Sequence, residues 1–404
     1  MDSTWMIGDL HIHSRFSRAC SKNINFPNLV KWAKVKGLHL LGTSDFTHPQ
    51  WLEEIKINLV EKNGLFYYED FPFVLSGEIS LMYTQGRGRR VHLVLLAPSL
   101  EVVDKINSYF DTKGRRDYDG RPIFKIPCDE FVREMKNISE EIEVIPAHIW
   151  TPWFGMLGSK SGFDSLKECF GDETKNIFAI ETGMSSDPEM NWKMSELNDK
   201  AIVSFSDSHS FWPWRIGREA TIFKKADSYS ELIRQIREND FIGTIETDPA
   251  YGKYHWDGHR NCGISFEPAK TREIGGVCPK CGNALTIGVE NRVDELATQK
   301  PEDAQGRKNF HKLLPLTEII SAVCGSGLAT KKTWAIYNSF IEKFENEFEV
   351  LLFVPFEKLM KEFPDDDKMI NAIMKNREGK IKVKPGYDGV YGEAVIGDSQ
   401  KLLV

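Results

Sequence analysis

The sequence has no long apolar run. None of its segments approaches the ~20 consecutive apolar residues that cross a bilayer. The polar residues MDST lead almost directly into a histidine-containing motif, which leaves no room for the apolar core of a signal peptide. We therefore expect a cytoplasmic protein that does not bind membranes.

Cysteine and net positive charge are also scarce. The seven cysteines are an odd number, and three of them have the spacing of a metal knuckle, so we expect reduced thiols and bound metal rather than a disulfide framework. A net charge of −7 argues against a protein that coats nucleic acid nonspecifically, although local basic patches could still contact a phosphate backbone.

The length of 404 residues suggests two or three domains. Residues 1–248 alternate short apolar strands with amphipathic helices, which is typical of parallel βα units. The first helix is expected to begin after Asn25, with Pro27 in its first turn, and to end at Gly37. Residues 249–290 predict a zinc-binding ribbon. Residues 291–404 predict a helical domain whose last segment is a small hairpin or an extended tail.

Potential metal ligands stand at six predicted strand ends. His11 and His13 are two residues apart, so on a strand they point the same way, and Asp207 and His209 share that geometry. One such pair alone could be ordinary core histidine, but two pairs with four further ligands favour a metal site. Its predicted ligands are His11, His13, Asp45, Glu78, His92, His148, Asp207 and His209.

These residues suit two or three Zn²⁺ ions, with Mg²⁺ or Mn²⁺ as alternatives for activity. Metal ions bridged by a carboxylate can bind a phosphate and activate water. Because ligands follow nearly every strand, and no Gly-rich phosphate loop is present, we favour an α/β fold of the distorted TIM-like βα-barrel type over an open doubly wound sheet.

The motifs DLHIHS, TSDFTHP, GEI, RRVHLVLLA, PAH and SDSH, in this order, resemble the polymerase-and-histidinol-phosphatase (PHP) superfamily. The resemblance covers about the first 225 residues and implies a distorted βα barrel with a trinuclear metal cluster that hydrolyses phosphate esters. It also implies that Glu78 is the bridging carboxylate. The positions that match the family's ligands are His11, His13, Glu78, His92, His148, Asp207 and His209.

The chain departs from that pattern in two places. Many members have Thr-Asp-His in the second motif, whereas here Asp45 is followed by Phe46 and the histidine is displaced to His48, which leaves Asp45 and His48 as less secure ligands. Many members also carry Asp or His shortly after the first motif, where this chain has Arg18. Either one metal has fewer ligands, or Arg18 binds a phosphate.

A second metal site is predicted in the ribbon. Its two knuckles, His-x-x-Cys-Gly and Cys-x-x-Cys-Gly, stand fifteen residues apart, which fits one four-coordinate structural zinc. The predicted ligands are His259, Cys262, Cys278 and Cys281, with His255 as a rival for the fourth position.

Beyond the barrel, the segments YHWDGHRNCG, CPKCGNALTIGVENRVDELA, PLTEIIS and PGYDGVYG make the chain resemble the endonuclease Q family nearly from end to end. This resemblance implies a DNA repair endonuclease that cuts 5′ of deaminated bases (uracil, hypoxanthine and xanthine) and at abasic sites. We expect cleavage to leave 3′-hydroxyl and 5′-phosphate ends, with Asp207, Glu78, His11 and His13 as the catalytic residues. A sliding clamp is a further candidate partner, although the terminal LLV is too short to predict a clamp-binding peptide.

Three segments are candidates for substrate binding. An enzyme that inspects one base needs an aromatic pocket with a few polar contacts. The loop after His148 is the first candidate for such a pocket, and SFWPWR after His209 is the second; packing over the barrel mouth is the alternative for both. GSGLATKK could bind phosphates or simply begin a helix. The predicted contacts are Arg18, Trp150, Trp153, Phe154, Ser159, Lys160, Lys331 and Lys332.

Two other functions compete with this interpretation. A small-molecule phosphatase of the histidinol-phosphate or nucleotide type would share the barrel but would have no use for the ribbon. A noncatalytic scaffold that binds zinc and nucleic acid is disfavoured, because disused sites tend to lose ligands.

Overall fold

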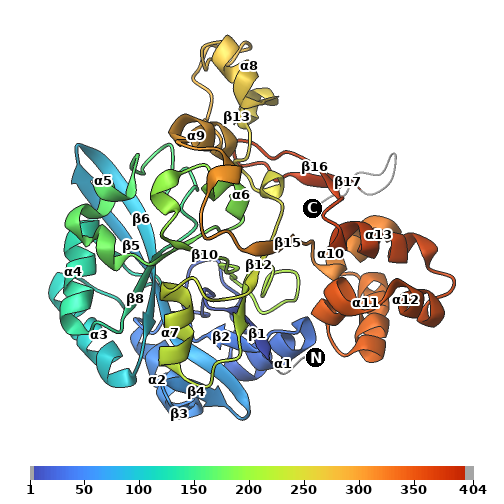
Figure 1. Ribbon diagram of the computed structural model, residues 1–404, viewed down its shortest axis with the longest axis horizontal. Helices are drawn as coiled ribbons and strands as arrows, with labels where there is room; N and C mark the ends of the chain where they lie inside the picture. The colour runs from blue at the N-terminus through green and yellow to red at the C-terminus, as the bar shows by residue number, and fades with distance from the viewer. Residues whose placement is uncertain (1–3, 396–404) are drawn as a thin grey trace.

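The computed structural model describes residues 4–395, and its largest element is a mixed sheet of eleven strands (Figure 1). The C-terminal residues LLV lie outside the described residues. The strands of the sheet are β1 (Trp5–Asp9), β2 (Leu40–Gly42), β3 (Val60–Lys62), β4 (Leu65–Tyr68), β5 (Phe71–Gln85), β6 (Arg87–Ala97), β7 (Ile123–Phe124), β8 (Glu143–Pro146), β11 (Ala220–Lys224), β12 (Gly243–Glu246) and β15 (Asn309–Lys312).

Strand directions are mixed, which differs from the parallel units expected from the sequence. β1, β2 and β5 are parallel neighbours, but β11 runs antiparallel to β1, and β6 runs antiparallel to both β5 and β8. The cause is the long β5–β6 hairpin, whose strands connect directly, without a crossover helix.

A separate parallel pair, β9 (Ala179–Glu181) and β10 (Ala201–Val203), completes the barrel wall. Ile149 N, just after β8, donates to Glu181 O, and Ser204 N, just after β10, donates to Thr221 Oγ1 in β11. A closed barrel would have continuous hydrogen-bond ladders between β8 and β9 and between β10 and β11. In the part of the chain that the structure describes, only such individual contacts join these strands, so the barrel is distorted and its sheets do not close.

Helices cover the outside of this wall (Figure 1). They are α1 (Phe26–Lys36), α2 (Pro49–Asn58), α3 (Leu100–Lys113), α4 (Cys128–Ile138), α5 (Leu166–Phe170), α6 (Pro188–Asn191) and α7 (Tyr229–Arg237). The boundaries predicted for the first helix are confirmed: Asn25 Oδ1 accepts from Asn28 N, and Gly37 ends α1 at φ 95°. No helix within residues 4–395 combines the length and apolarity needed to cross a bilayer.

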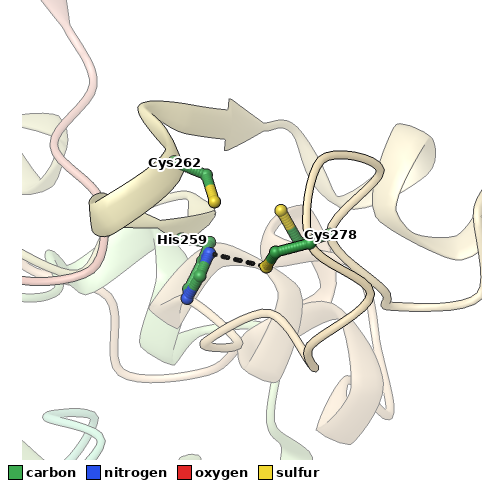
Figure 2. A group of neighbouring side chains, drawn as sticks. His259, Cys262 and Cys278 are labelled. Carbon is green, nitrogen blue, oxygen red and sulfur yellow. Dashed lines mark hydrogen bonds between the residues drawn. The ribbon is translucent and has the colours of Figure 1, made fainter.

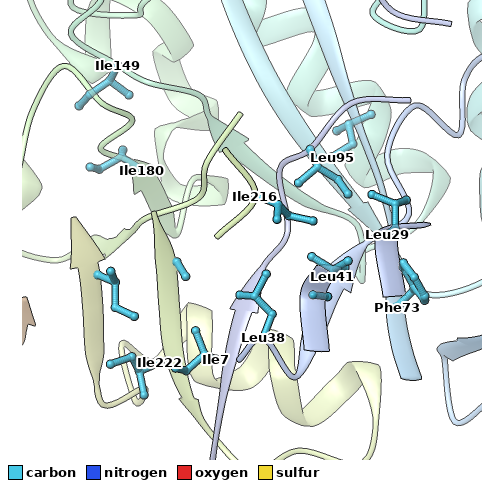
Figure 3. Close-up of a cluster of buried hydrophobic side chains, with 14 of the residues drawn as sticks. Ile7, Leu29, Leu38, Leu41, Phe73, Leu95, Ile149, Ile180, Ile216 and Ile222 are labelled. Carbon is cyan, nitrogen blue, oxygen red and sulfur yellow. The ribbon is translucent and has the colours of Figure 1, made fainter. Parts of the chain in front are cut away.

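Apolar side chains of the barrel strands pack against the covering helices (Figure 3). Ile7, Leu41 and Phe73, on β1, β2 and β5, are fully buried, and the Phe73 ring lies 5.5 Å from that of Phe26 in α1. The alternate residues Leu40 and Val74, on the same face as Glu78, belong to a second buried cluster inside the barrel. Burying each such side chain contributes about 1.5–3 kcal/mol. This packing fixes the strand ends from which the polar residues of the mouth project.

The ribbon lies above the barrel in Figure 1 and contains β13 (Asp257–His259), β14 (Ile264–Phe266) and α8 (Pro268–Glu273), followed by α9 (Val289–Leu296). The C-terminal helices are α10 (Leu316–Cys324), α11 (Lys331–Phe344), α12 (Phe356–Glu362) and α13 (Asp367–Arg377), of which the sequence did not predict α13. β16 (Lys382–Lys384) and β17 (Glu393–Val395) pair antiparallel, which confirms the hairpin alternative for the last segment.

Buried ion pairs join the C-terminal helices to the barrel. Arg218 binds Glu318 at 2.7 and 3.2 Å, and Lys36 Nζ lies 2.7 Å from Glu347 Oε1. β15 also pairs parallel to β12, so residues 309–312 belong to the main sheet, although the sequence placed them in the helical domain.

Candidate metal centre

The first motif and the last barrel motif meet at the mouth. Ile12 and Ser208 form a parallel bridge, and His13 N donates to Ser208 O, so the segments that follow β1 and β10 lie side by side. This pairing brings His13 Nε2 within 2.9 Å of Asp207 Oδ1, and His11 Nε2 within 3.6 Å of the same oxygen.

Glu78 stands between two groups of imidazoles. Its Oε2 atom lies 3.5 Å from His11 Nε2 and 3.1 Å from His13 Nε2. Its Oε1 atom lies 2.7 Å from His92 Nδ1 and 3.2 Å from His148 Nε2. One carboxylate thus has one oxygen in each of two adjoining donor groups.

Glu78 and His92 lie inside the β5–β6 hairpin, although the sequence placed each of them at a strand end. Glu78 is opposite Val94, and His92 is opposite Ser80, so the two side chains are diagonal neighbours on one face. The strands continue beyond both residues, to Gln85 and from Arg87.

The donor atoms fit divalent metal ions. Ligands about 2.0–2.2 Å from one tetrahedral ion are about 3.4 Å apart, which matches the separations around Glu78. His11 Nε2, His13 Nε2 and Asp207 Oδ1 are buried atoms without a hydrogen-bond partner among residues 4–395. Leaving such atoms unsatisfied is costly, and a shared cation would satisfy all three. The two donor groups are His11, His13, Glu78 and Asp207, and Glu78, His92 and His148.

An outer layer of acceptors orients the imidazoles. His11 Nδ1 lies 2.8 Å from Glu181 Oε1, and His13 Nδ1 lies 3.1 Å from Asp45 Oδ1. A carboxylate on Nδ1 holds the proton there and leaves Nε2 free to bind a metal. Glu181, the last residue of β9, was missed, although it directly ends an apolar strand, as the sequence had suggested for Glu78. Asp45, predicted as a ligand, belongs to this outer layer in the structure.

Nearby charges and burial have opposite effects on the pKa values of the histidines in this centre. For His11, burial disfavours the imidazolium, but the carboxylates of Glu181 and Glu78 outweigh it and raise the pKa well above its ordinary value. For His92, burial lowers the pKa to about 4, so this imidazole is neutral, as a ligand must be. The clustered carboxylates therefore attract positive charge, which divalent ions would supply.

Strained backbone surrounds the same atoms. Ser44, Asp45, His148 and Asp207 all have positive φ, between 31° and 62°, which non-glycine residues rarely adopt. Each follows a barrel strand, and the side chains of Asp45, His148 and Asp207 face the imidazoles or Glu78 of the centre. Such strain is typical of functional sites. This strain could not be predicted from the sequence.

The other predicted barrel ligands lie farther out. His48 stacks on Phe16, with ring centroids 4.3 Å apart, and belongs to neither donor group. The ring of His209 lies 4.6 Å from that of His13, and its Nδ1 donates to Asp207 O at 2.8 Å. His209 therefore lies at the rim of the centre rather than in its middle.

A cavity of 570 Å³ opens beside the centre and contains Asp207, His148 and His209 in its wall. Arg215, Arg218, Lys253 and Tyr391 also line it, so the cavity has cationic groups opposite the metal ligands. Lys253 Nζ lies 4.5 Å from the centroid of the Tyr391 ring, which comes from the C-terminal hairpin. Of these four residues, Arg215 lies in SFWPWR, the second segment proposed for base binding, whereas Arg218, Lys253 and Tyr391 were not predicted.

The aromatic residues predicted in the loop after His148 have different surroundings in the structure. Trp150 is fully buried, and its indole N–H donates to Asn191 Oδ1, so it packs in the core rather than at the rim. Trp153 is 36% exposed and contacts Tyr254, while Phe154 packs on His92 with ring centroids 4.4 Å apart. Ser159 Oγ donates to the ribbon-side carbonyl of residue 287, and residue 160 is exposed beside it.

The second aromatic segment lies against the C-terminal helices. Trp212 and Trp214 stack at 5.4 Å with an interplanar angle of 3°, and both contact Trp334 of α11. Lys331 and Lys332 are exposed at the start of α11, one turn from Trp334. The tryptophans thus join the segment after His209 to the helix that carries both lysines.

The four predicted ligands of the ribbon come together (Figure 2). Figure 2 shows His259, Cys262 and Cys278 pointing toward one another, and Cys281 Sγ lies 3.4 Å from His259 Nδ1. The glycines after the second ligand of each knuckle have positive φ, 63° and 76°. For Cys278, burial raises the thiol pKa, but the N–H groups of residues 280 and 281 outweigh it and lower the pKa to about 6. His255 is not in this group.

Similar proteins extend over nearly the whole chain. A lesion-specific endonuclease from Pyrococcus furiosus, PfuEndoQ, is 31% identical with a TM-score of 0.86, and the match covers 97% of this chain and 95% of that one. A solved complex of endonuclease Q with a 27-mer duplex that carries an abasic lesion is 32% identical, also with a TM-score of 0.86, over 98% and 97% of the two chains.

Other matches cover parts of the chain. The MJ0043 C-terminal domain family matches residues 315–380. The protein MJ0043 of Methanocaldococcus jannaschii is 34% identical over 250 residues, which are 60% of this chain but only 31% of that protein.

Proposed function

Because this chain belongs to the endonuclease Q family, we propose that it is a metal-dependent DNA repair endonuclease that cuts 5′ of deaminated bases and at abasic sites. The observation that carries the proposal is the pair of donor groups that share Glu78 and adjoin a cavity with cationic walls. The related structure that holds a duplex with an abasic lesion supports DNA as the substrate.

Divalent ions bound at the two donor groups would lower the pKa of a water molecule and neutralise charge on a phosphate. His11, His13 and Asp207 would hold one ion, His92 and His148 the other, and Glu78 both. Zinc is our first candidate for the barrel, with two or three ions there and one more in the ribbon; Mg²⁺ or Mn²⁺ could also support activity.

The proposed reaction adds water across the P–O3′ bond. The water oxygen bonds to phosphorus, the P–O3′ bond breaks, and the released oxygen takes up a proton, so the products are a 3′-hydroxyl and a 5′-phosphate. The protein's part is to fix the reacting groups: Glu181 and Asp45 orient the imidazoles of His11 and His13, while the rigid mouth holds Asp207 beside both.

The cavity is our candidate for the damaged nucleotide. A flipped base needs stacking surfaces and a few polar contacts, and the lining offers Tyr391, Arg215 and Lys253. We keep Arg18, Trp153, Phe154, Ser159, Lys160, Lys331 and Lys332 as DNA contacts at the rim and along α11. Trp150 is left out of the proposal because it is buried. A sliding clamp as partner remains part of the proposal for a DNA repair role.

The test is cleavage of matched duplexes by the full chain. Duplexes with one uracil, one hypoxanthine, one abasic site or no lesion are incubated with Mg²⁺, Mn²⁺ or Zn²⁺. Cuts 5′ of the lesions with an intact undamaged duplex would support the proposal. Release of phosphate from histidinol phosphate or a nucleoside monophosphate, without DNA cleavage, would instead support a small-molecule phosphatase. Binding without any hydrolysis would support a scaffold.

A further inference from the structure

One arginine reaches the middle of the metal centre. Arg121 Nη1 lies 2.8 Å from Glu78 Oε2, the oxygen that also faces His11 and His13. We propose that Arg121 is a catalytic residue that binds a non-bridging oxygen of the scissile phosphate and stabilises the charge that develops there. The proposal rests on the function proposed above and assigns a role to a residue that the sequence did not suggest.

The segment that carries Arg121 is fixed against the centre at several points. Gly120 N donates to Phe16 O, and Thr47 Oγ1 donates to Gly120 O, so residue 120 is held between the first two motifs. Arg121 N donates to Asp119 Oδ1 at 3.2 Å. These bonds leave the position of the Arg121 backbone little freedom, which is what a preorganised catalytic group requires.

Gly120 is needed for this close approach. A Cβ atom at this position would lie 2.1 Å from Asp45 Oδ2 and 2.3 Å from Ser17 Oγ, and Asp45 is the carboxylate that orients His13. Any side chain here would push the segment outward. The absence of one lets residues 119–122 pack directly on the outer layer of the metal centre.

The guanidinium of Arg121 has further hydrogen-bond donors available for a ligand. Within residues 4–395, its only side-chain hydrogen bond is the one from Nη1 to Glu78, so Nε and Nη2 remain available. The side chain is 23% exposed, which leaves it accessible to a ligand at the mouth. A planar guanidinium binds phosphate oxygens in a bidentate manner, as a lysine cannot.

Arg18, the sequence's candidate for phosphate binding, is placed differently. Its side chain is 77% exposed, and its Nε lies 3.2 Å from Asp119 Oδ2, on the outer side of the segment. Asp119 therefore accepts from Arg18 on one side and from the Arg121 backbone on the other. Arg121, rather than Arg18, is therefore placed to bind the scissile phosphate.

The first test compares Arg121→Met and Arg121→Lys with Arg115→Met. Arg115 is the matched control because it lies in the same connection, is 76% exposed and, among residues 4–395, forms its ion pair with nearby Asp117 alone. With the full metal-loaded chain and an abasic duplex, we expect Arg121→Met to lower kcat by about 10²–10³-fold, as loss of a donor to developing charge does elsewhere. Arg121→Lys should recover part of that loss, and Arg115→Met should match the wild type.

Three further readouts separate a phosphate contact from a structural role. Metal content by elemental analysis and DNA affinity by fluorescence anisotropy should be unchanged in Arg121→Met. Replacing a non-bridging oxygen of the scissile phosphate with sulfur should slow the wild type more than Arg121→Met, because the variant no longer contacts that oxygen. Loss of metal from the variant, or an equal effect of sulfur on both proteins, would overturn the proposal.

A generic phosphodiester, bis(p-nitrophenyl) phosphate, distinguishes failure of this inference from failure of the proposed function. If the wild type ignores lesion-containing DNA but hydrolyses the generic substrate, a loss in Arg121→Met still supports the role of Arg121. If the wild type cuts lesion-containing DNA and Arg121→Met cuts it as fast, the inference alone is overturned. If the wild type hydrolyses neither substrate, both fail.

Discussion

The barrel centre and the ribbon are two candidate metal sites built in opposite ways. The ribbon's ligands all come from residues 259–282, and one of them, Cys281, is exposed. The barrel's ligands come from positions as distant as His11 and Asp207, and its imidazoles are at most 8% exposed. One site is local and open, whereas the other depends on the whole fold.

The difference concerns what holds each site when the metal is absent. In the ribbon, the four ligands come from one short segment and Cys281 is exposed, so we expect metal binding to supply much of the folding free energy there. In the barrel, the packed core and the outer carboxylates Glu181 and Asp45 position the ligands beforehand. We therefore expect the ribbon to need its metal for structure and the barrel to need metal for chemistry.

The largest expected effect is that of Asp207→Asn. Asp207 Oδ1 faces both His11 and His13, and an amide there binds metal more weakly than a carboxylate. Cleavage of an abasic duplex should fall by about 10³-fold or more, while DNA affinity by anisotropy should stay within a few-fold of the wild type. Asp199→Asn, which changes an exposed carboxylate, is the control. Cleavage at the normal rate would exclude Asp207 as an essential ligand.

The next effect should be confined to the ribbon. Cys262→Ser removes one of its four ligands, so the purified protein should contain one equivalent of zinc less, and the ribbon should become sensitive to proteolysis. Hydrolysis of bis(p-nitrophenyl) phosphate in the barrel should continue. Cys324→Ser, in a helix end away from the ribbon ligands, serves as the control. If Cys262→Ser also lost hydrolysis of bis(p-nitrophenyl) phosphate, the two sites would not be independent.

A smaller effect is expected in the outer layer of the barrel centre. Glu181→Gln weakens the bond that orients His11, which should lower metal affinity by about 10–100-fold. Titration of the metal-free protein should show this shift, and excess metal should restore most of the cleavage activity. If added metal restored nothing, Glu181 would act in some other way than by orienting a ligand.

The smallest effect concerns pH and the barrel core. Burial raises the pKa of Glu246 to about 8 from its ordinary 4.5, although hydroxyls such as that of Thr244 donate to it. The folded state therefore holds a proton that the unfolded chain releases, so the free energy of unfolding contributed by this group falls as pH rises between these values. In denaturant titrations, Glu246→Gln should make the free energy of unfolding depend less on pH. Exposed Glu53→Gln should leave this pH dependence unchanged. An unchanged slope would contradict the buried, protonated state.

The same contrast explains what the sequence could predict. The ribbon ligands could be read from the spacing of the two knuckles within one short segment, although spacing left His255 open as a rival for the fourth position. His11, His13 and Asp207 were identified because strand alternation and motif order carry the signal. The caps of α1 were also readable, since Asn25 and Gly37 act on their own backbone neighbours.

What the sequence missed depends on contacts between distant segments. The outer position of Asp45, the burial of Trp150 and the approach of Arg121 to Glu78 follow from how loops pack on one another. The antiparallel β5–β6 hairpin was hidden because an apolar strand shows the same alternation in either direction. Spacing along the chain carries no information on these points.

The most direct test counts metal ions in the pure, active protein. Elemental analysis should find at least three equivalents of divalent metal per chain, one for the ribbon and two for the donor groups that share Glu78. Chelation should abolish phosphodiester cleavage, and added metal should restore it. A single equivalent, with cleavage unaffected by the chelator, would contradict the proposed metal centre.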